Sequence, residues 1–311
     1  MNIYDNITQL VGNTPLVRLS RFSEGFGLCT PLVAKVEAFN PLSSAKDRVA
    51  CALIADAEEK GMLAPGGLII ESTSGNTGVG LAFAAAAKGY RLILTMPSSM
   101  SEERKRLLSA LGATLVLTDP SKGMQGAVDE AHRLHSENPG SIMAGQFTNP
   151  ANPQAHYRTT GQEIWRDTDG AVDIFVAGIG TGGTVSGVGR ALREHKPAVT
   201  VVGVEPAGSP LLTEGRAGPH KIQGIGANFI PENLDRDILS RVVTVTDDEA
   251  ATATRQLAVT EGILVGISSG AALAAAVRIA KESEHAAKQI VVLLPDTGER
   301  YLSTGLFQNI Q

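Results

Sequence analysis

The residues best suited to chemistry form the glycine-rich stretch G-I-G-T-G-G-T, residues 178–184. An apolar run, V-D-I-F-V-A, precedes it, and a helix-forming run, S-G-V-G-R-A-L-R, follows it. The pattern predicts a buried strand, a glycine turn and a helix. Because the first N–H groups of a helix lack intrahelical partners and lie at the positive end of its dipole, residues 180–184 are expected to bind a phosphate.

The identity of that phosphorylated ligand stays open at this point. Gly178, Gly180 and Gly183 also satisfy the G-x-G-x-x-G pattern of dinucleotide-binding folds. Glu205 ends the next apolar run, at roughly the 20-residue spacing of the acid that binds the ribose. A nicotinamide cofactor, another phosphorylated group and a simple packing turn are all compatible with this stretch alone.

Lys46 occupies an unusual place for a cation. Ser43 or Ser44 is a candidate N-cap for a helix that should continue to Gly61, so Lys46 falls in the first turn. The helix field there disfavours an ammonium and favours the neutral amine. A neutral lysine is what imine formation with a carbonyl cofactor requires, although surface lysines also occur at such places.

A second glycine-containing turn, T-S-G-N-T-G, spans residues 73–78 between an apolar run and an alanine-rich helix. The hydroxyl groups of Thr73, Ser74 and Thr77 and the amide of Asn76 could hold a substrate carboxylate. Helix N-capping by Ser74 or Asn76 is the alternative interpretation.

Composition limits the classes of function. The 311 residues carry a net charge of -5 and are 43% hydrophobic, as in ordinary globular proteins of one large or two smaller domains. The acidic balance and the lack of a basic run argue against nucleic acid. Cys29 and Cys51 have no metal-ligand or disulfide spacing, which suits a reducing compartment. With no export signal or membrane-length apolar run, the chain is expected to be cytoplasmic.

The elements that must position these residues alternate along the chain. Strands are predicted at 32–37, 91–96 and 114–118, with helices at 100–111 and 123–134. A further strand, G-I-L-V-G-I, is predicted before Ser268 and its helix. Such alternation indicates parallel sheets. His132 and His135 share one helix, but no partner is spaced to complete a metal site.

Small polar residues therefore recur at four helix N-termini, near Lys46, 73–78, 180–184 and 268–270. In doubly wound sheets, ligands collect at the carboxyl ends of strands, so one shared cleft is the simplest interpretation. Pyridoxal phosphate combines a phosphate, an aldehyde that needs a lysine and a ring nitrogen that needs a partner. A dinucleotide has no use for Lys46.

Several motifs in this order and spacing resemble the cysteine synthases (O-acetylserine sulfhydrylases) of the fold-type II pyridoxal phosphate enzymes. They are N-P-x-x-S-x-K-D-R around Lys46, T-S-G-N-T-G, G-T-G-G-T and G-I-S-S-G-A. The resemblance covers nearly the whole chain and implies two doubly wound, mostly parallel α/β domains with the cofactor in the cleft between them. It places the domains at 1–150 and 151–311, with 13–38 crossing to the second domain and about 91–135 as the mobile part.

The resemblance also assigns roles to residues. Lys46 would form the Schiff base and move the α-proton, Asn76 would bind the 3′ oxygen of the cofactor, and Ser268 would face the pyridine nitrogen. The expected phosphate ligands are Gly180, Thr181, Gly182, Gly183 and Thr184. The expected ligands of the substrate carboxylate are Thr73, Ser74, Thr77 and Gln146. Asn228 departs from the family pattern, in which glycine is frequent, and so bears on the leaving-group pocket.

The reaction implied by the resemblance is β-replacement, in which O-acetyl-L-serine and sulfide give L-cysteine through an aminoacrylate intermediate. A homodimer and a partner, the C-terminal tail of serine acetyltransferase, are expected on the same basis. O-phosphoserine as donor, or serine with homocysteine as in cystathionine β-synthase, are the alternatives within the fold. A nicotinamide oxidoreductase and a catalytically silent binding protein of the same fold are the alternatives from other functional classes.

Overall fold

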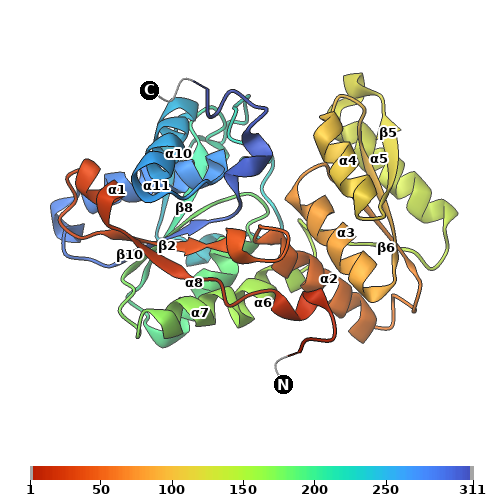
Figure 1. Cartoon of the computed structure of the whole chain (residues 1–311), viewed down its shortest axis with the longest axis horizontal. Helices are drawn as coiled ribbons and strands as arrows, with labels where there is room; N and C mark the ends of the chain where they lie inside the picture. Colours follow the sequence, from red (N-terminus) through yellow and green to blue (C-terminus); the bar gives the residue numbers. More distant parts are fainter. Residues whose placement is uncertain (1–2, 309–311) are drawn as a thin grey trace. The chain divides into compact units, whose positions relative to one another are not determined.

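The computed structural model describes residues 3–308, which form two compact units of alternating strands and helices (Figure 1). One unit, here unit one, comprises the chain up to Val11 together with Asn40–Ala151. The other, unit two, comprises Gly12–Phe39 together with the chain from Asn152 onward. Each unit holds one sheet, and all strand pairs but one are parallel. The predicted α/β class with mostly parallel sheets is therefore confirmed.

Unit one is built on a four-stranded parallel sheet in the order β5-β4-β3-β6. Its strands are β3 (Leu68–Ser72), β4 (Arg91–Pro97), β5 (Thr114–Thr118) and β6 (Ile142–Met143). Its helices are α2 (Lys46–Glu59), α3 (Asn76–Lys88), α4 (Glu102–Ala110) and α5 (Gly123–Glu137). Alternate residues of β3 serve opposite faces, because Ile69 packs with α2 and α3 whereas Leu68 and Ile70 pack with Ala131 of α5. Helices on both faces explain why β3 and β4 are mostly apolar.

Unit two is built on a six-stranded sheet in the order β1-β2-β10-β7-β8-β9. Its strands are β1 (Leu16–Leu19), β2 (Leu32–Val36), β7 (Ile174–Gly178), β8 (Thr200–Pro206), β9 (Arg241–Val245) and β10 (Ile290–Leu294). Its helices are α1 (Ser20–Gly25), α6 (Ala151–Arg158), α7 (Thr160–Asp167), α8 (Gly183–His195), α9 (Leu211–Glu214), α10 (Asp247–Glu261) and α11 (Ile267–Ala280). Edge strand β1 is antiparallel to β2.

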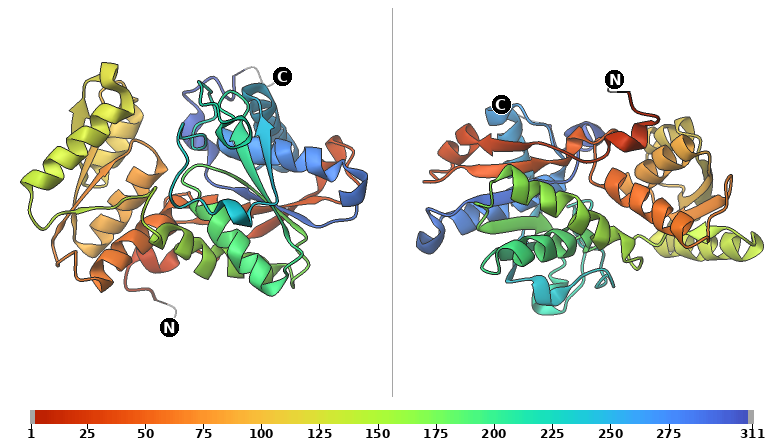
Figure 2. Two further views of the ribbon diagram at one scale, coloured as in Figure 1. Left: turned by 180° about the vertical axis from the view of Figure 1, so that it is seen from behind. Right: turned by 90° about the horizontal axis from the view of Figure 1, so that it is seen from below.

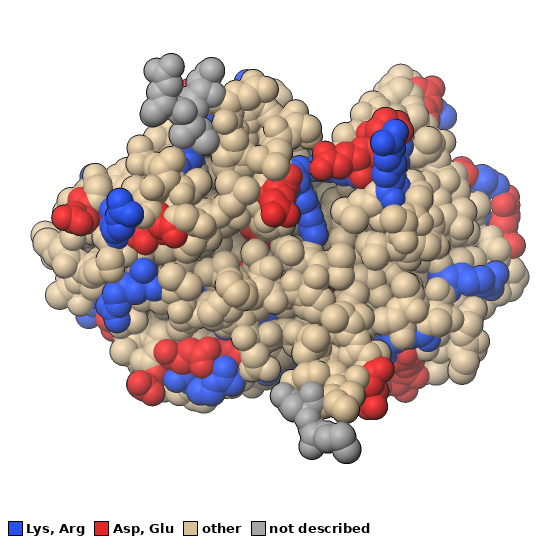
Figure 3. Space-filling view, in the orientation of Figure 1, with Lys and Arg blue, Asp and Glu red and all other residues tan. Residues whose placement is uncertain are grey.

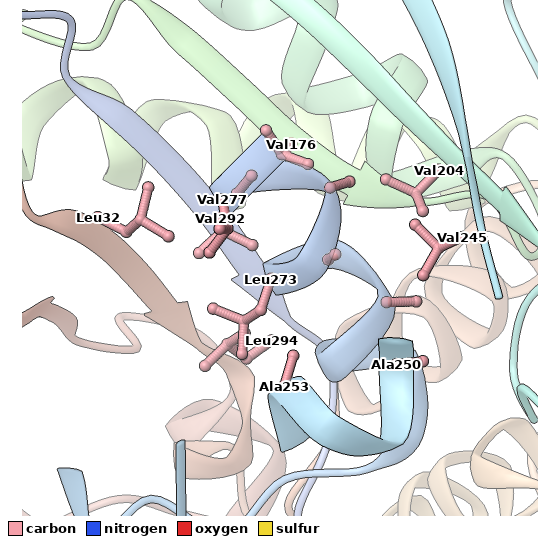
Figure 4. Packing of buried hydrophobic residues seen from close by; sticks show 14 of the residues in the cluster. Leu32, Val176, Val204, Val245, Ala250, Ala253, Leu273, Val277, Val292 and Leu294 are labelled. Carbon is pink, nitrogen blue, oxygen red and sulfur yellow. The ribbon is translucent and has the colours of Figure 1, made fainter. Parts of the chain in front are cut away.

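Helices cover both faces of the sheet of unit two (Figure 2), and the core of this unit accordingly has two layers, one on each face. Val292 and Leu294 of β10 pack against α11, where Leu273 and Val277 lie over them (Figure 4). The intervening residues Val291 and Leu293 point to the other face, where α7 and α8 pack. This alternation fixes the register of the strand, because a shift of one residue would exchange the two layers.

The predicted strand G-I-L-V-G-I is wrong. In the structure Val265 makes only an isolated bridge to Thr297, and the segment is the short connection between α10 and α11. Gly262, with φ +68°, ends α10, and Gly266 is the N-cap of α11. Two helix ends so close together leave no room for a paired strand. The antiparallel edge strand β1, by contrast, was not foreseen.

The surface has no strong charge pattern on the face shown in Figure 3, where basic and acidic side chains lie next to one another among uncharged ones. Among residues 3–308, no helix combines the length and the hydropathy needed to cross a membrane.

A buried lysine joins β2 to α7. Lys35 is fully buried, and its Nζ lies 2.7 Å from Oε2 of Glu163 and donates a hydrogen bond to the carbonyl of Thr14 at 2.5 Å. Glu163 also accepts the N–H of Asn13 at 2.9 Å. This ion pair ties the 12–39 segment to the rest of unit two.

We expect Lys35→Met to lower the free energy of unfolding by about 3 kcal/mol, because it leaves Glu163 as a buried charge without its partner. The matched control is Lys196→Met, which removes the partly exposed pair with Asp173 at 2.8 Å and should cost less than about 1 kcal/mol. Urea-induced unfolding of both variants measures the difference. Equal losses would contradict the assignment of the buried pair as the stronger contribution.

Candidate active site

The glycine turn after β7 has the geometry of an anion-binding loop. Strand β7 ends at Gly178 and α8 begins at Gly183, with Gly182 as N-cap in the left-handed conformation, φ +80°. A Cβ at Gly182 would lie 2.7 Å from the Cα of Leu234, so the position requires glycine for both conformation and space. The N–H groups of the first helical turn have no intrahelical acceptors and are available to a phosphate.

Side chains from α6 support this loop from one side. The Oγ1 of Thr181 accepts a hydrogen bond from Nδ2 of Asn152 at 2.9 Å, and the Oγ1 of Thr184 lies 3.2 Å from Nε2 of His156. Gly183 packs so tightly on Asn152 that an added Cβ would lie 2.0 Å from its Oδ1. The loop is therefore held in one conformation before any ligand binds.

Ser268 lies beside the same loop. It is in the first turn of α11 and is 4% exposed. Gly224 connects the two, because a Cβ at Gly180 would lie 2.3 Å from the Gly224 carbonyl and a Cβ at Gly224 would lie 3.5 Å from the Ser268 Oγ. Unit two thus brings together the predicted phosphate loop, Gly224 and Ser268.

Glu205 is not free to bind a ribose. It is 3% exposed, and its carboxylate accepts the N–H groups of Leu212 and Thr213 at 2.8 and 3.0 Å and the Thr213 hydroxyl at 2.6 Å. These bonds cap the start of α9. The acid that made the dinucleotide interpretation plausible is therefore a structural residue.

In unit one, α2 begins at Lys46, so the lysine is in the first turn as predicted. The predicted N-cap is wrong, since Ala45 occupies that place and Ser43 has φ +57°. Ser44 nevertheless accepts the N–H of Lys46 at 3.2 Å. The Lys46 carbonyl packs on α3, where a Cβ at Gly80 would lie 2.7 Å from it. The start of α2 and the first turns of α3 are therefore neighbours.

The turn at 73–78 leads into α3, which begins at Asn76. Its N-cap is Gly75, with no side-chain hydrogen bond, so capping by Ser74 or Asn76 is wrong as the explanation of these polar residues. Thr77 is buried and its hydroxyl donates to Oε1 of Gln146 at 2.5 Å. Unit one thus assembles two of the residues expected to bind a carboxylate, next to the lysine helix.

Sequence reasoning missed Glu71, which lies one residue before the end of β3. It is 5% exposed and accepts the N–H of Gly145 at 2.8 Å. Burial raises the pKa of Glu71 to about 7, opposed by hydrogen bonds from backbone N–H groups. The sequence signal was present, because L-I-I-E-S places one acid in an otherwise apolar strand.

Asn228 adopts φ +64°, a left-handed conformation that asparagine tolerates better than other residues with a side chain. This explains why glycine would also suit the position. Its Oδ1 accepts the hydroxyl of Ser209 at 2.8 Å. Together with Ile179 and Gly180, both residues line a small cavity beside the glycine loop.

The chain belongs to the pyridoxal-phosphate dependent enzyme family, whose model matches residues 7–296. It is 50% identical to cysteine synthase A of Escherichia coli K12, over 99% of this chain and 97% of the relative. It is 51% identical to a cysteine synthase of Haemophilus influenzae over the full length of both.

Solved structures show the same similarity. O-acetyl serine sulfhydrylase isoform 3 from Entamoeba histolytica superposes with a TM-score of 0.96 at 45% identity, over 100% of this chain and 93% of that one. O-ureido-L-serine synthase superposes with a TM-score of 0.94 at 44% identity, over 99% and 96%. The predicted class, a pyridoxal phosphate enzyme, is therefore confirmed.

The residues present fit pyridoxal phosphate. Unit two supplies a loop whose glycines pack so closely on neighbouring residues that added Cβ atoms would clash with them, and a buried serine next to it. Unit one supplies an amine in the first turn of α2 and a hydroxyl–amide pair for an anionic group. The phosphate, the ring nitrogen and the aldehyde of the cofactor, and the carboxylate of an amino acid, thus each have a candidate partner among these groups.

Gly182→Ala should raise the dissociation constant for pyridoxal phosphate about tenfold or more, or 1.4 kcal/mol, because the new methyl group must displace Leu234 and the first-turn N–H groups. Gly215→Ala is the matched control, with φ +69° but no atom within 4 Å of the new Cβ. Gly215→Ala should lose stability only through the strained backbone conformation of the new alanine, and its affinity for the cofactor should stay at the wild-type value. Titration of both apoproteins with the cofactor, followed by absorbance, tests this. Equal affinities would show that the loop does not hold the phosphate.

Proposed function

We propose that the protein is a cysteine synthase that makes L-cysteine and acetate from O-acetyl-L-serine and sulfide. The identity of 50–51% to cysteine synthases over essentially the whole chain carries this proposal. The packing of Lys46 on α3, next to the turn that leads to Thr77, supports it.

In this proposal each part of the chain has a defined task. The bound cofactor supplies an electron sink for the negative charge at the substrate α-carbon. Lys46, as a neutral amine, takes the α-proton while the C–O bond to acetate breaks, and returns it after sulfide has formed the C–S bond. Asn76 binds the cofactor's 3′ oxygen, and Ser268 donates to or accepts from the ring nitrogen.

The substrate carboxylate is bound by the hydroxyl and amide groups of the turn, which are Thr73, Ser74, Thr77 and Gln146. The phosphate is bound by the loop residues, which are Gly180, Thr181, Gly182, Gly183 and Thr184. Neither set changes protonation during the reaction. Both hold the reacting groups in place, which converts binding energy into orientation.

The environment of Asn228 favours acetylserine over O-phosphoserine as donor. The cavity beside Gly180 is lined by neutral side chains apart from Glu205, whose oxygens cap α9. Arg216, which precedes Asn228 in sequence, pairs with Glu214 at 3.1 Å. A phosphate leaving group with two negative charges would need a cation such as arginine.

We further propose a cytoplasmic homodimer that can bind the C-terminal tail of serine acetyltransferase. Cys29 and Cys51 are free thiols, which supports a reducing compartment. Exposed apolar side chains of the N-terminal segment, among them Tyr4, Ile7 and Leu10, support a second copy as partner. Light scattering measures the mass, and titration with a peptide of that tail measures the interaction.

Lys46→Ala should lower kcat by about a thousandfold or more, because no other group would move the α-proton. Lys60→Ala is the control, since Lys60 lies just beyond the other end of α2 in an exposed pair with Asp56. Borohydride reduction of the wild-type holoenzyme followed by peptide mapping should place the cofactor on Lys46. If the reduced cofactor were found on another lysine, the assignment of Lys46 as the Schiff-base lysine would be wrong.

The donor and the nucleophile are tested by kcat/KM for acetylserine, phosphoserine and serine, each with sulfide and with homocysteine. Acetylserine with sulfide should be the preferred pair. A tenfold preference for another pair, about 1.4 kcal/mol in the transition state, would overturn the proposed substrates. The cofactor assignment would then still stand.

A further inference from the structure

Glu71 is a buried carboxylate that the proposed reaction does not use directly. It lies at the carboxyl end of β3, the strand that leads into the 73–78 turn. Its Oε2 accepts the N–H of Gly145 at 2.8 Å, and the N–H groups of Ser72 and Gln146 also donate to the carboxylate. Among residues 3–308, these backbone bonds and not a lysine or arginine compensate its burial.

The segment that Glu71 holds is a closed turn. The carbonyl of Gly145 accepts the N–H groups of Thr148 and Asn149 at 3.1 and 2.8 Å, and Gly145 itself has φ +70°. Just before it, the N–H of Ala144 donates to the carbonyl of Ile70 at 3.3 Å. These bonds close the turn, and the Ala144 bond and the Glu71 carboxylate attach it to β3, next to the pairing of β3 with β6.

The side chain of Gln146 reaches from this turn to α3, where its Oε1 accepts the Thr77 hydroxyl at 2.5 Å. Gln146 is 6% exposed and Thr77 is 3% exposed, so small displacements of the turn cannot be absorbed by side-chain freedom. A contact of 2.5 Å across two elements requires that the backbone of Gln146 be fixed relative to β3.

We propose that Glu71 is a positioning residue which, by holding the N–H groups of Gly145 and Gln146, sets the place of the Gln146 amide against Thr77 and thereby the affinity for the substrate carboxylate. The inference rests on the proposed function in one respect, which is that Thr77 and Gln146 bind that carboxylate.

A carboxylate suits this task better than an amide. It presents two acceptor oxygens and no hydrogen, whereas a glutamine of the same size presents one oxygen and two donors. In Glu71→Gln at least one backbone N–H of the turn would face another donor, or the side chain would leave it without an acceptor. The turn would then shift while β3 and α3 keep their apolar packing, because the substitution changes no volume.

The test is a double-mutant cycle in the holoenzyme at pH 8, with Glu71→Gln, Gln146→Ala and the double variant. Glu71→Gln should raise KM for acetylserine about tenfold and change kcat less than twofold. In the Gln146→Ala background, the same substitution should change KM less than twofold, because both residues then act through one contact. Amide exchange of the 144–149 peptide should quicken in Glu71→Gln.

Asp173→Asn is the matched control, because Asp173 also accepts a backbone N–H, from Gln289 at 2.9 Å, but belongs to unit two, whereas Gln146 belongs to unit one. Its KM should stay at the wild-type value. A fall in kcat at constant KM in Glu71→Gln, or the same tenfold effect with and without Gln146, would overturn the inference. If Glu71→Gln does not fold, Glu71→Asp runs the same cycle, since it keeps the charge and shortens the reach.

The wild type and the three variants of the cycle also distinguish a failure of this inference from a failure of the proposed function. Binding of L-serine, followed through the cofactor's absorbance, needs no turnover. If the wild type does not convert acetylserine and sulfide, the proposed function fails. The effect of Glu71→Gln with and without Gln146 is then compared through the dissociation constants for L-serine in place of KM. If Gln146→Ala leaves L-serine binding unchanged, the inference itself is wrong.

Discussion

Glycine lets backbone segments adopt close approaches or left-handed conformations in both units, and the local structure around the candidate site residues of each unit depends on this constraint. In unit two, Gly180 packs on the carbonyl of Gly224, and Gly224 in turn on Ser268. In unit one, Gly80 lets α3 pack on the carbonyl of Lys46. A methyl group at Gly180 or Gly80 would push apart the backbone segments that carry the candidate site residues within each unit.

The second constraint is that each buried charged side chain needs a group that compensates its charge. Lys35 is compensated by a carboxylate, whereas Glu71 and Glu205 are compensated by backbone N–H groups. Backbone donors fix a segment of chain, and not just a side chain, because the amide belongs to the turn that it holds. Glu71 and Glu205 therefore act as supports for the chain segments whose N–H groups they accept.

Much of this could be predicted from sequence. The alternation of strand and helix gave the mostly parallel sheets, and Lys46 lies in the first turn of α2 as expected. Local patterns failed where tertiary context decides. The stretch before Ser268 has strand-like residues, yet two helix ends leave it no partner strand. Glu71 carried a visible signal, but its bonds to Gly145 join positions far apart in sequence, which no local pattern shows. The residue roles assigned by resemblance, including those of Lys46, Asn76 and Ser268, stay predictions.

The division of the chain between the two units has a consequence for its synthesis. Strand β2 is made early, but its parallel neighbour β10 follows about 250 residues later, which takes about 12 to 50 s at ~5–20 residues per second. Unit one is nearly continuous in sequence and can be completed within that time. Until β10 emerges from the ribosome, the apolar strand β2 exposes one edge that can pair with other chains. The nascent protein therefore needs protection at its beginning until its end has been made.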